Sequence, residues 1–304
     1  MRLRLPPWLD ALRPSQLAKN ALVLAGFFFA LPDRHQAGID PLGAGFRTLA
    51  AAALFALVSG AVYLLNDVHD APRDRLHPEK RRRPVASGAL SPRAALAECA
   101  LLVAGSAALA PLLGRTFALV LGGYFAMQLA YTFALKRVPL LDVACIAAGF
   151  ALRVWAGVAA AGVALAPAIL VCTFCGALFL ALCKRLAEIR EFAEFGSFEA
   201  ALAHRPVLRW YSPFVVFPTI LVSALATLAA YSAWALSPET AEKFGTRGMA
   251  LTIPFVLFGL VHYARLVVRG QGGGRPEKVL LHDRPTQLCI ALYLATCAAV
   301  WLAR

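Results

Sequence analysis

Long apolar runs, separated by short polar segments, dominate the pattern of this chain. Each run is close to the 20 residues that an α-helix needs to cross about 30 Å of hydrocarbon. Such runs lie at 16–32, 46–66, 92–111, 115–135, 140–161, 166–187, 210–234, 249–268 and 286–303. The first is the weakest, because it is short and contains Lys19 and Asn20. The pattern predicts an all-α, polytopic membrane bundle of about nine transmembrane helices.

Composition supports helices in lipid rather than a water-soluble fold. Over 304 residues the chain is 60% hydrophobic and 15% charged, with a mean hydropathy of +0.67, which is too apolar for a protein whose whole surface meets water. The runs are also too long and continuous for barrel strands, and lipid leaves no other way to satisfy the backbone hydrogen bonds. We expect one integral-membrane domain over residues 1–304.

The net charge of +13 is unevenly distributed. Lys and Arg gather in the N-terminal segment and in the even-numbered connections, while the other connections are short and nearly neutral. The positive-inside rule then places the N-terminus and the even-numbered connections in the cytoplasm and the C-terminus outside. This distribution favours a function on the cytoplasmic side of the inner membrane and argues against nucleic acid as a partner.

Acidic residues concentrate where the second run ends, in YLLNDVHDAPRDRLHPEKRRRPVASG at 63–88. The helical repeat places the carboxylates of Asp67, Asp70 and Asp74 on one face, beside Asn66. Carboxylates that close repel one another, so a divalent cation is the natural counter-charge, and hard oxygen ligands favour Mg²⁺. A solvated helix end with scattered acids is the alternative. Pro72 weakens the argument for Asp74, because proline disturbs a helix.

Several basic and aromatic residues stand at the ends of other runs. Lys80 and Arg83 follow the acidic stretch and either bind phosphate or mark topology at the lipid headgroups. Tyr131 and Lys136 end the fourth run, where Tyr131 could equally anchor the helix at the interface. Arg153 lies inside the fifth run, where an unpaired cation is costly. It should face the bundle interior and a polar partner, either in a substrate site or in a structural ion pair.

The end of the sixth run carries Lys184, Arg185 and Glu188. A cationic pair suits a directly bound phosphate, because Lys and Arg both donate hydrogen bonds to phosphate oxygens. The alternative is an ordinary ion pair between Lys184 and Glu188, one turn apart at a helix end.

The acidic stretch resembles a known family signature. NDVHDAPRD followed by HPEKRRRPVASG is similar to the motif of the UbiA superfamily of intramembrane prenyltransferases. More narrowly, four stretches resemble the decaprenyl-phosphate phosphoribosyltransferases of that superfamily: RPSQLAKNALVLAG (13–26), YFAMQLAYTFALKR (124–137), CKRLAEIREF (183–192) and RPEKVLLHDRPTQL (275–288). The resemblance covers nearly the whole chain, with departures at Leu17, where the family usually has Trp, and Lys278, where an acid is common.

The resemblance implies transfer of 5-phosphoribose from phosphoribosyl diphosphate to a polyprenyl phosphate, with release of diphosphate and with Mg²⁺ as cofactor. Asp67, Asp70 and Asp74 would hold the metal ion, and Asn66, Tyr131 and Glu188 would orient the ribose or the metal. The expected substrate-binding residues are Lys19, Asn20, Lys80, Arg83, Lys136, Arg153, Lys184, Arg185, Asp283 and Arg284. For the last two, an ion pair within the loop is the alternative.

Two other functions remain open from the sequence. One is an ordinary UbiA-type prenyltransferase, which moves a prenyl group from a prenyl diphosphate to an aromatic acceptor. Such enzymes carry a second Asp-rich motif after the sixth helix, and this chain lacks it there. The other is an anion transporter, because charged residues in membrane helices also occur on transport paths. The connections predicted to lie outside are short and nearly neutral, which argues against a transporter.

Overall fold

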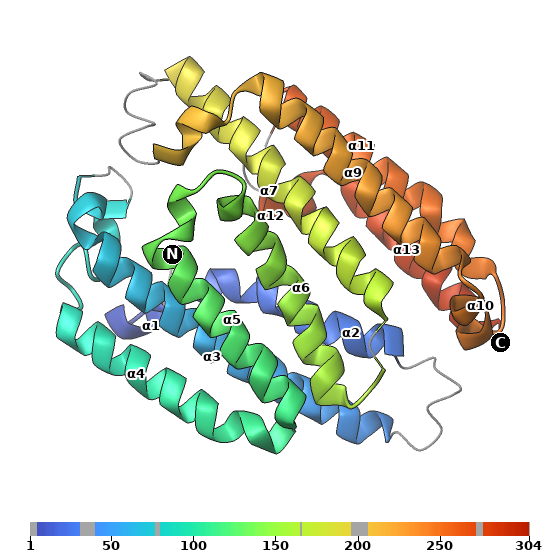
Figure 1. Ribbon diagram of the computed structural model, residues 1–304, viewed down its shortest axis with the longest axis horizontal. Coiled ribbons are helices and arrows are strands. Elements are labelled where there is room, and N and C mark those ends of the chain that lie inside the picture. Colours follow the sequence, from blue (N-terminus) through green and yellow to red (C-terminus); the bar gives the residue numbers. More distant parts are fainter. Residues whose placement is uncertain are drawn as a thin grey trace. The chain divides into compact units, whose positions relative to one another are not determined.

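The computed structural model describes residues 5–30, 40–76, 80–164, 166–195, 206–271 and 276–303, and within these ranges it is helical (Figure 1). In that part of the chain, 8 helical segments are long and apolar enough to cross a membrane. They are α3 (Pro41–Asp74), α4 (Pro92–Leu109) with η3 (Ala110–Leu113), α5 (Arg115–Phe133), α6 (Leu141–Ala161), α7 (Pro167–Phe195), α9 (Pro213–Leu236), η6 (Gly248–Thr252) with α11 (Ile253–Val268), and α13 (Arg284–Leu302). The chain is an integral membrane protein with multiple spans.

The remaining helical elements are short. They are α1 (Pro7–Ala11), η1 (Pro14–Ala21), α2 (Leu22–Ala30), η2 (Lys80–Arg82), η4 (Leu135–Arg137), η5 (Pro206–Trp210), α10 (Pro238–Phe244) and α12 (Pro276–His282). Most connect the long helices, but η1 and α2 together occupy the first predicted run.

The structure corrects the prediction of one continuous helix over 16–32. Arg13 has a left-handed backbone (φ 53°) directly before Pro14, and the chain then forms the 3₁₀ segment η1 before the 9 residues of α2. Asn20, in η1, is 4% exposed, and its side chain accepts a hydrogen bond from Arg153. Contacts of this kind, rather than apolar length, shape the N-terminal segment.

Helix α3 is longer than the predicted run 46–66. Asp40 caps its N-terminus by accepting hydrogen bonds from the backbone N–H groups of Leu42 and Gly43. Pro72 does not end the helix, which continues to Asp74, so the doubt that Pro72 raised about Asp74 is removed. Pro72 lies in the last turn, so only two residues of the helix follow it and its ring disturbs little of the helix. Asp74 therefore stays on the same helix face as Asp67.

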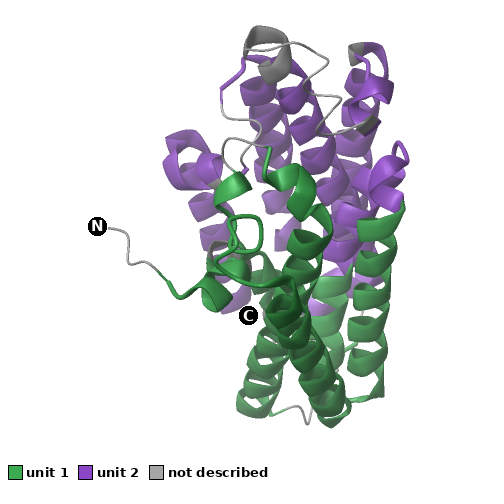
Figure 2. Ribbon diagram, turned by 90° about the vertical axis from the view of Figure 1, so that its left-hand side faces the viewer, with its two compact units in different colours: residues 1–31, 39–134, 152–165 green, residues 32–38, 135–151, 166–304 purple. Residues whose placement is uncertain are grey.

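Contacts divide the chain into two compact units, coloured separately in Figure 2. Unit 1 comprises residues 1–31, 39–134 and 152–165, and unit 2 comprises 32–38, 135–151 and 166–304, so α6 contributes to both. In unit 1, α3 packs against α4, α5 and the N-terminal segment, around a core that includes Phe55, Phe117 and Tyr124. In unit 2, α7, α9 and α11 pack around a core that includes Phe179 and Leu182.

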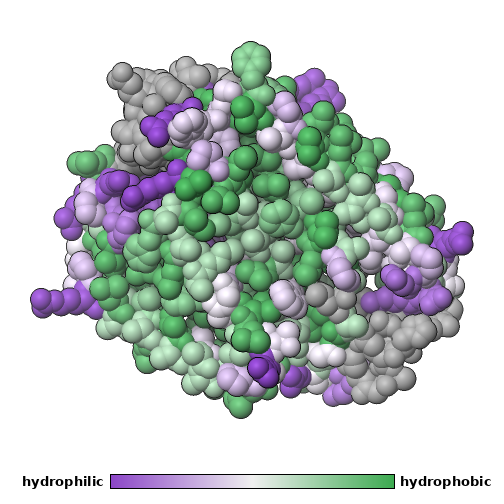
Figure 3. All heavy atoms as spheres, viewed as in Figure 1, coloured by the Kyte–Doolittle hydropathy of each residue, from purple (hydrophilic) through white to green (hydrophobic). Residues whose placement is uncertain are grey.

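Large hydrophobic side chains are exposed on the long helices. Leu101 of α4 is 72% exposed, Phe214 of α9 92% and Leu302 of α13 80%. The face drawn in Figure 3 is mostly hydrophobic, with polar side chains gathered toward its edges. Such a surface is stable only where lipid is the solvent.

Candidate functional site

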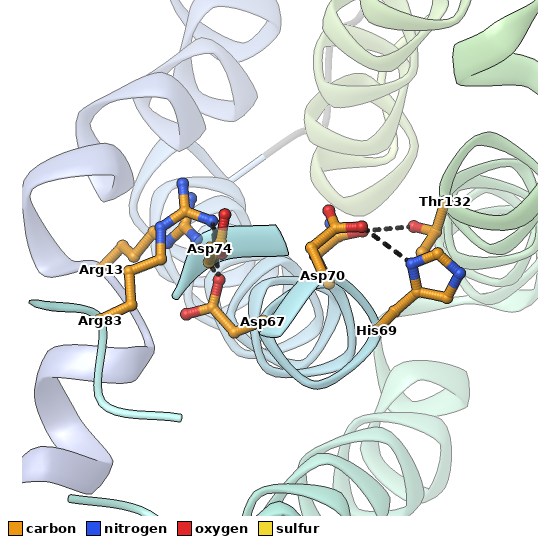
Figure 4. Close-up of polar contacts among 8 residues, drawn as sticks. Arg13, Asp67, His69, Asp70, Asp74, Arg83 and Thr132 are labelled. Carbon is orange, nitrogen blue, oxygen red and sulfur yellow. Dashed lines mark hydrogen bonds and ion pairs between the residues drawn. The ribbon is translucent and has the colours of Figure 1, made fainter. Parts of the chain in front are cut away.

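The C-terminal end of α3 brings two buried carboxylates to two arginines (Figure 4). Asp67 is 1% exposed and Asp74 is 5% exposed. The Nη1 atom of Arg83 donates to Asp74 Oδ2 at 2.6 Å and lies 3.4 Å from Asp67 Oδ1. Arg13 donates to the same Oδ1 atom from the N-terminal segment. We refer to Arg13, Asp67, Asp74 and Arg83 as the acidic cluster.

The acidic cluster is balanced in charge, with two carboxylates and two guanidinium groups. This balance offsets the high cost of burying ions, because each charge has an opposite partner. One atom is an exception. Asp67 Oδ2 is buried and has no hydrogen-bond partner among the residues that the structure describes. A buried carboxylate oxygen in this state is destabilising, which makes Asp67 Oδ2 a candidate ligand atom for a group that the protein itself does not supply.

Asp70 faces a different neighbour. At about 100° per residue, Asp74 lies about 20° around the helix from Asp67, whereas Asp70 lies about 60° away. His69 Nδ1 is 2.8 Å from Asp70 Oδ1 (Figure 4). Thr132 of α5 donates to Asn66 Oδ1 at 2.7 Å. The expected convergence of three carboxylates is thus observed for Asp67 and Asp74, while Asp70 and Asn66 lie on the adjoining side.

The donor set fits a magnesium ion that is completed by substrate. Within the described ranges, no group of three or more His, Cys, Asp or Glu side chains is arranged to hold a metal ion. Proteins commonly bind Mg²⁺ through only one or two carboxylates, and waters and substrate phosphates supply the remaining oxygens. Asp67, with its unpartnered Oδ2, and Asp74 provide such a pair.

Arg153 lies in a second polar cluster inside unit 1. It is 6% exposed, donates from Nε to Asn20 Oδ1 and from Nη2 to the Tyr124 hydroxyl, both at 2.9 Å, and stacks over the Tyr124 ring. The prediction that Arg153 faces the interior and a polar partner is confirmed. Gln128 also donates to the Tyr124 hydroxyl at 2.9 Å. The sequence analysis missed Tyr124 and Gln128, although their spacing of four residues in an apolar run was a usable signal.

Unit 2 contains a buried network around Arg185, which is 1% exposed. Its Nε donates to Asp142 Oδ2 at 3.0 Å, and its Nη1 donates to Glu188 Oε2 at 2.6 Å. Tyr211 donates to the other oxygen of Asp142 and accepts from the backbone N–H of Leu140 at 3.0 Å. Arg185 is therefore held by two carboxylates, while its sequence neighbour Lys184 is exposed.

Asp283 is the N-cap of α13. It accepts hydrogen bonds from the backbone N–H and the hydroxyl of Thr286 and lies 2.8 Å from His262 Nε2. Burial alone would raise the pKa of Asp283, but these hydrogen bonds outweigh it and lower the pKa below its usual value. The alternative of an ion pair with Arg284 is not observed, because Asp283 pairs with His262 and Arg284 is exposed.

The other predicted site residues lie at helix ends. Lys19 is exposed in η1, Lys80 is half-buried in η2, and Tyr131 and Lys136 are half-buried at the end of α5 and in η4. The partners Arg13 and Tyr211 were not among the predicted site residues. Only the stretch RPSQLAKN hinted at Arg13, and nothing in the sequence pointed to Tyr211.

The chain is similar to a known protein family and to named members of it. Residues 21–283 match the model of the UbiA prenyltransferase family. The decaprenyl-phosphate phosphoribosyltransferase of Corynebacterium glutamicum is 34% identical over 301 residues, covering 97% of this chain and 86% of that protein. The enzyme of the same name from Mycolicibacterium smegmatis is 32% identical over 298 residues, covering 96% and 91%.

A solved structure shows the same fold. A UbiA homolog from Archaeoglobus fulgidus bound to GPP and Mg²⁺ superposes with a TM-score of 0.70 at 21% sequence identity, covering 97% of this chain and 99% of that one. At 21% identity, this structural similarity establishes the fold alone.

Proposed function

Because the chain belongs to the UbiA prenyltransferase family, a family of transferases, we propose that it transfers 5-phosphoribose from phosphoribosyl diphosphate to a polyprenyl phosphate. Two relatives at 34% and 32% identity over nearly the whole chain are named for such a phosphoribosyl transfer, with decaprenyl phosphate in their names. A decaprenyl-like acceptor is therefore the first to test.

The reaction joins an acceptor oxygen to the ribose. An oxygen of the lipid phosphate forms a bond to the anomeric carbon C1, and the bond between C1 and the diphosphate oxygen breaks, with its electron pair leaving on diphosphate. A phosphate monoester has a second pKa near 6 and is mostly ionised near pH 7, so the acceptor needs no general base. Catalysis then consists of positioning the two substrates and neutralising the charge of the leaving group.

The acidic cluster carries the proposal. Asp67 and Asp74 would hold Mg²⁺, with Asp70 adjoining them, and the ion would supply positive charge to the departing diphosphate. Arg13 and Arg83 hold the two carboxylates in position through ion pairs, and the unpartnered Asp67 Oδ2 would be the ligand oxygen that the fold leaves open. The single observation behind the proposal is this buried, unpartnered oxygen beside a second carboxylate at a helix end.

The other residues have supporting roles in the proposal. Asn66, Tyr131 and Glu188 would orient ribose or metal. The phosphates of the two substrates would be bound by basic and polar residues at helix ends, namely Lys19, Asn20, Lys80, Arg83, Lys136, Arg153, Lys184, Arg185, Asp283 and Arg284. For Arg185 this role requires that Asp142 and Glu188 share it with substrate. The distribution of basic residues favours a site on the cytoplasmic side of the inner membrane.

A direct assay tests the proposal. Purified protein with Mg²⁺ is incubated with ribose-labelled phosphoribosyl diphosphate and polyprenyl phosphate, and label is measured in the lipid phase. We expect lipid-phase label that disappears with a magnesium chelator and falls at least about 100-fold in Asp67→Asn, as when a transition-state contact is removed. Glu242→Gln, at an exposed acid on α10, is the matched control and should retain activity.

The competing activity gives a distinct outcome. If the protein transferred label only from a prenyl diphosphate to an aromatic acceptor, the chain would be an ordinary prenyltransferase of the family. The phosphoribosyl proposal would then be rejected, although the role of Asp67 in binding metal would stand.

A further inference from the structure

An apolar groove runs along the surface of unit 2, between α7, α9 and α11. It is lined by side chains without polar groups other than one thiol, among them Phe217, Leu221, Leu225, Leu257, Val261 and Val268. Leu221, Leu225 and Val261 are 60%, 57% and 60% exposed, so the groove is open along one side. Since these helices are membrane spans, the open side faces lipid.

The length of the groove corresponds to one leaflet. Its lining residues on α9 extend from Phe217 to Leu228, and those on α11 from Leu257 to Val268. Each stretch rises by about 16 Å, at about 1.5 Å per residue. The hydrocarbon core of a bilayer is about 30 Å thick, so the groove covers about half of it. Its volume of about 290 Å³ lies at the small end for ligand sites, which suits one chain rather than a whole lipid.

A cation stands at one end of the groove. Arg190, where the α7 span ends, donates from Nη1 to the backbone carbonyls of Val267, at 3.1 Å, and Val268 at the end of α11. Its guanidinium carbon lies 6.0 Å from the centre of the Phe217 ring. Phe217, Val267 and Val268 all line the groove. The carbonyls at the helix end hold the cation in place.

Part of this guanidinium is available to a ligand. Only Nη1 is used in the hydrogen bonds found for Arg190 within the described part of the chain, which leaves Nε and Nη2 as donors. Two parallel N–H donors match the oxygens of a phosphate. The end of a span is also the depth at which lipid phosphates lie.

We propose that this groove is a specific binding site for an anionic membrane phospholipid, with one acyl chain along α9 and α11 and the phosphate on Arg190. The length favours an acyl chain of one leaflet over a polyprenyl chain, which is far longer than the groove. The site is independent of the proposed transferase reaction, since it uses none of the residues assigned to that reaction.

Native mass spectrometry tests the site directly. The purified protein is exchanged into detergent micelles that contain phosphatidylglycerol or phosphatidylcholine, and retained lipid is counted. We expect the wild-type protein to retain one phosphatidylglycerol more strongly than phosphatidylcholine. Arg190→Gln should weaken that preference about fivefold, the value of one arginine near anionic lipid. Ala264→Phe, which fills the groove, should abolish retention of this lipid.

Arg209→Gln is the control, because Arg209 is exposed, contacts Trp210 and does not line the groove. It should retain lipid as the wild type does. Equal retention of the two lipids, or retention unchanged in Arg190→Gln, would overturn the proposal without any reference to activity. Displacement of phosphatidylglycerol by an equal amount of polyprenyl phosphate would also overturn it and would assign the groove to the acceptor. If Ala264→Phe does not fold, two measurements still test the proposal: the retention of phosphatidylglycerol against phosphatidylcholine, and the retention by Arg190→Gln.

Discussion

Arg83 places one guanidinium nitrogen between two buried carboxylates of α3, within 2.6 Å of Asp74 and 3.4 Å of Asp67. Without Arg83, the carboxylates of Asp67 and Asp74 would repel each other at a buried position. Arg13 would then be the remaining cation of the cluster. Removing one member of a buried ion pair leaves an uncompensated charge, which is more damaging than the pair itself is stabilising.

We therefore expect Arg83→Gln to lower the free energy of unfolding by roughly 3 kcal/mol, the low end for a buried pair, because Arg83 is 27% exposed. Denaturant titration in detergent measures the change. Arg82→Gln, at the exposed neighbour in η2, should change little. Asp74→Asn in the Arg83→Gln background should restore part of the loss by removing the repulsion. No difference between the two arginine variants would contradict the structural role assigned to Arg83.

Tyr211 supports a second prediction, which depends on pH. Its hydroxyl joins Asp142 to the backbone of Leu140, and burial together with the hydrogen bond and negative charge of Asp142 raises the pKa of Tyr211 above its usual value. A raised pKa means that the folded protein favours the neutral phenol. The contribution to stability is then complete below about pH 10 and is lost as the pH rises above it toward the folded pKa.

We expect Tyr211→Phe to lower the free energy of unfolding by about 1–3 kcal/mol at pH 7, because Asp142 loses a buried donor. The gap between wild type and variant should stay constant from about pH 6 to 9 and narrow above about pH 10. Tyr63→Phe is the control at pH 7, since no hydrogen bond is found for the Tyr63 hydroxyl in the described part of the chain. A gap that widened with rising pH would contradict the assignment.

Single residues show how far the sequence predicts the site. The cluster of Asp67 and Asp74 could be anticipated, because helical spacing alone places residues seven apart on one face. Their partner Arg13 could not, since it lies 54 positions from Asp67 and reaches it only through tertiary packing. The same holds for Arg185 with Asp142, 43 positions apart. Sequence patterns predict which polar residues are buried better than they predict which residues pair.

At the scale of the helices, apolar length predicted the spans, but not where each helix ends. Helix α3 continues to Asp74 and α7 continues to Phe195, past the predicted ends at 66 and 187. These extensions are polar, so hydropathy does not detect them. Ion pairs support them instead, from Arg83 to Asp74 in one case and from Arg185 to Glu188 in the other.

A close approach of α2 and α6 in unit 1 depends on one glycine. A Cβ atom at Gly157 would overlap the backbone carbonyl oxygen of Val23. We therefore expect Gly157→Ala to force the two segments apart and to lower the free energy of unfolding by at least about 1–3 kcal/mol. Thermal unfolding in detergent measures the effect.

Gly105→Ala on α4 is the matched control, because a Cβ atom there meets no other atom within 4 Å. It should be neutral or stabilising by up to about 1 kcal/mol, since alanine is the better helix former. Equal behaviour of the two variants would show that α2 and α6 do not approach as closely as the structure indicates.

For the whole molecule, the number of membrane crossings decides the side on which the N-terminus lies. The structure has 8 long apolar helical segments in its described part, one fewer than the predicted runs. The N-terminal segment nevertheless follows α3 along its length. Arg13 contacts Asp67, Leu12 lies beside Gly60, and Phe27 lies beside Gly45. The segment and α3 therefore run in opposite directions.

The rise of the N-terminal segment supports a ninth crossing. The 8 residues of η1 rise by about 2.0 Å each and the 9 residues of α2 by about 1.5 Å each, which together give roughly 30 Å. That is about the thickness of the hydrocarbon core. A 3₁₀ segment thus lets 17 residues cover the distance that about 20 residues of α-helix would cover.

We therefore predict that the N-terminus lies on the same side as the basic connection after α3, in the cytoplasm. Cysteine is introduced singly at Asp10, Arg82 or Glu239, and each variant is probed in intact cells with a membrane-impermeant maleimide. The labelling of the native chain, which has its own cysteines, is subtracted. Glu239→Cys, in a connection predicted to be outside, should react, while Asp10→Cys and Arg82→Cys should react only after the membrane is permeabilised. Because Arg82 lies just beyond α3, reaction of Asp10→Cys but not Arg82→Cys in intact cells would mean that η1 and α2 do not cross. The N-terminal segment would then have to reach Asp67 from the opposite side of the membrane, which the pairing of Arg13 with Asp67 at the C-terminal end of α3 does not allow.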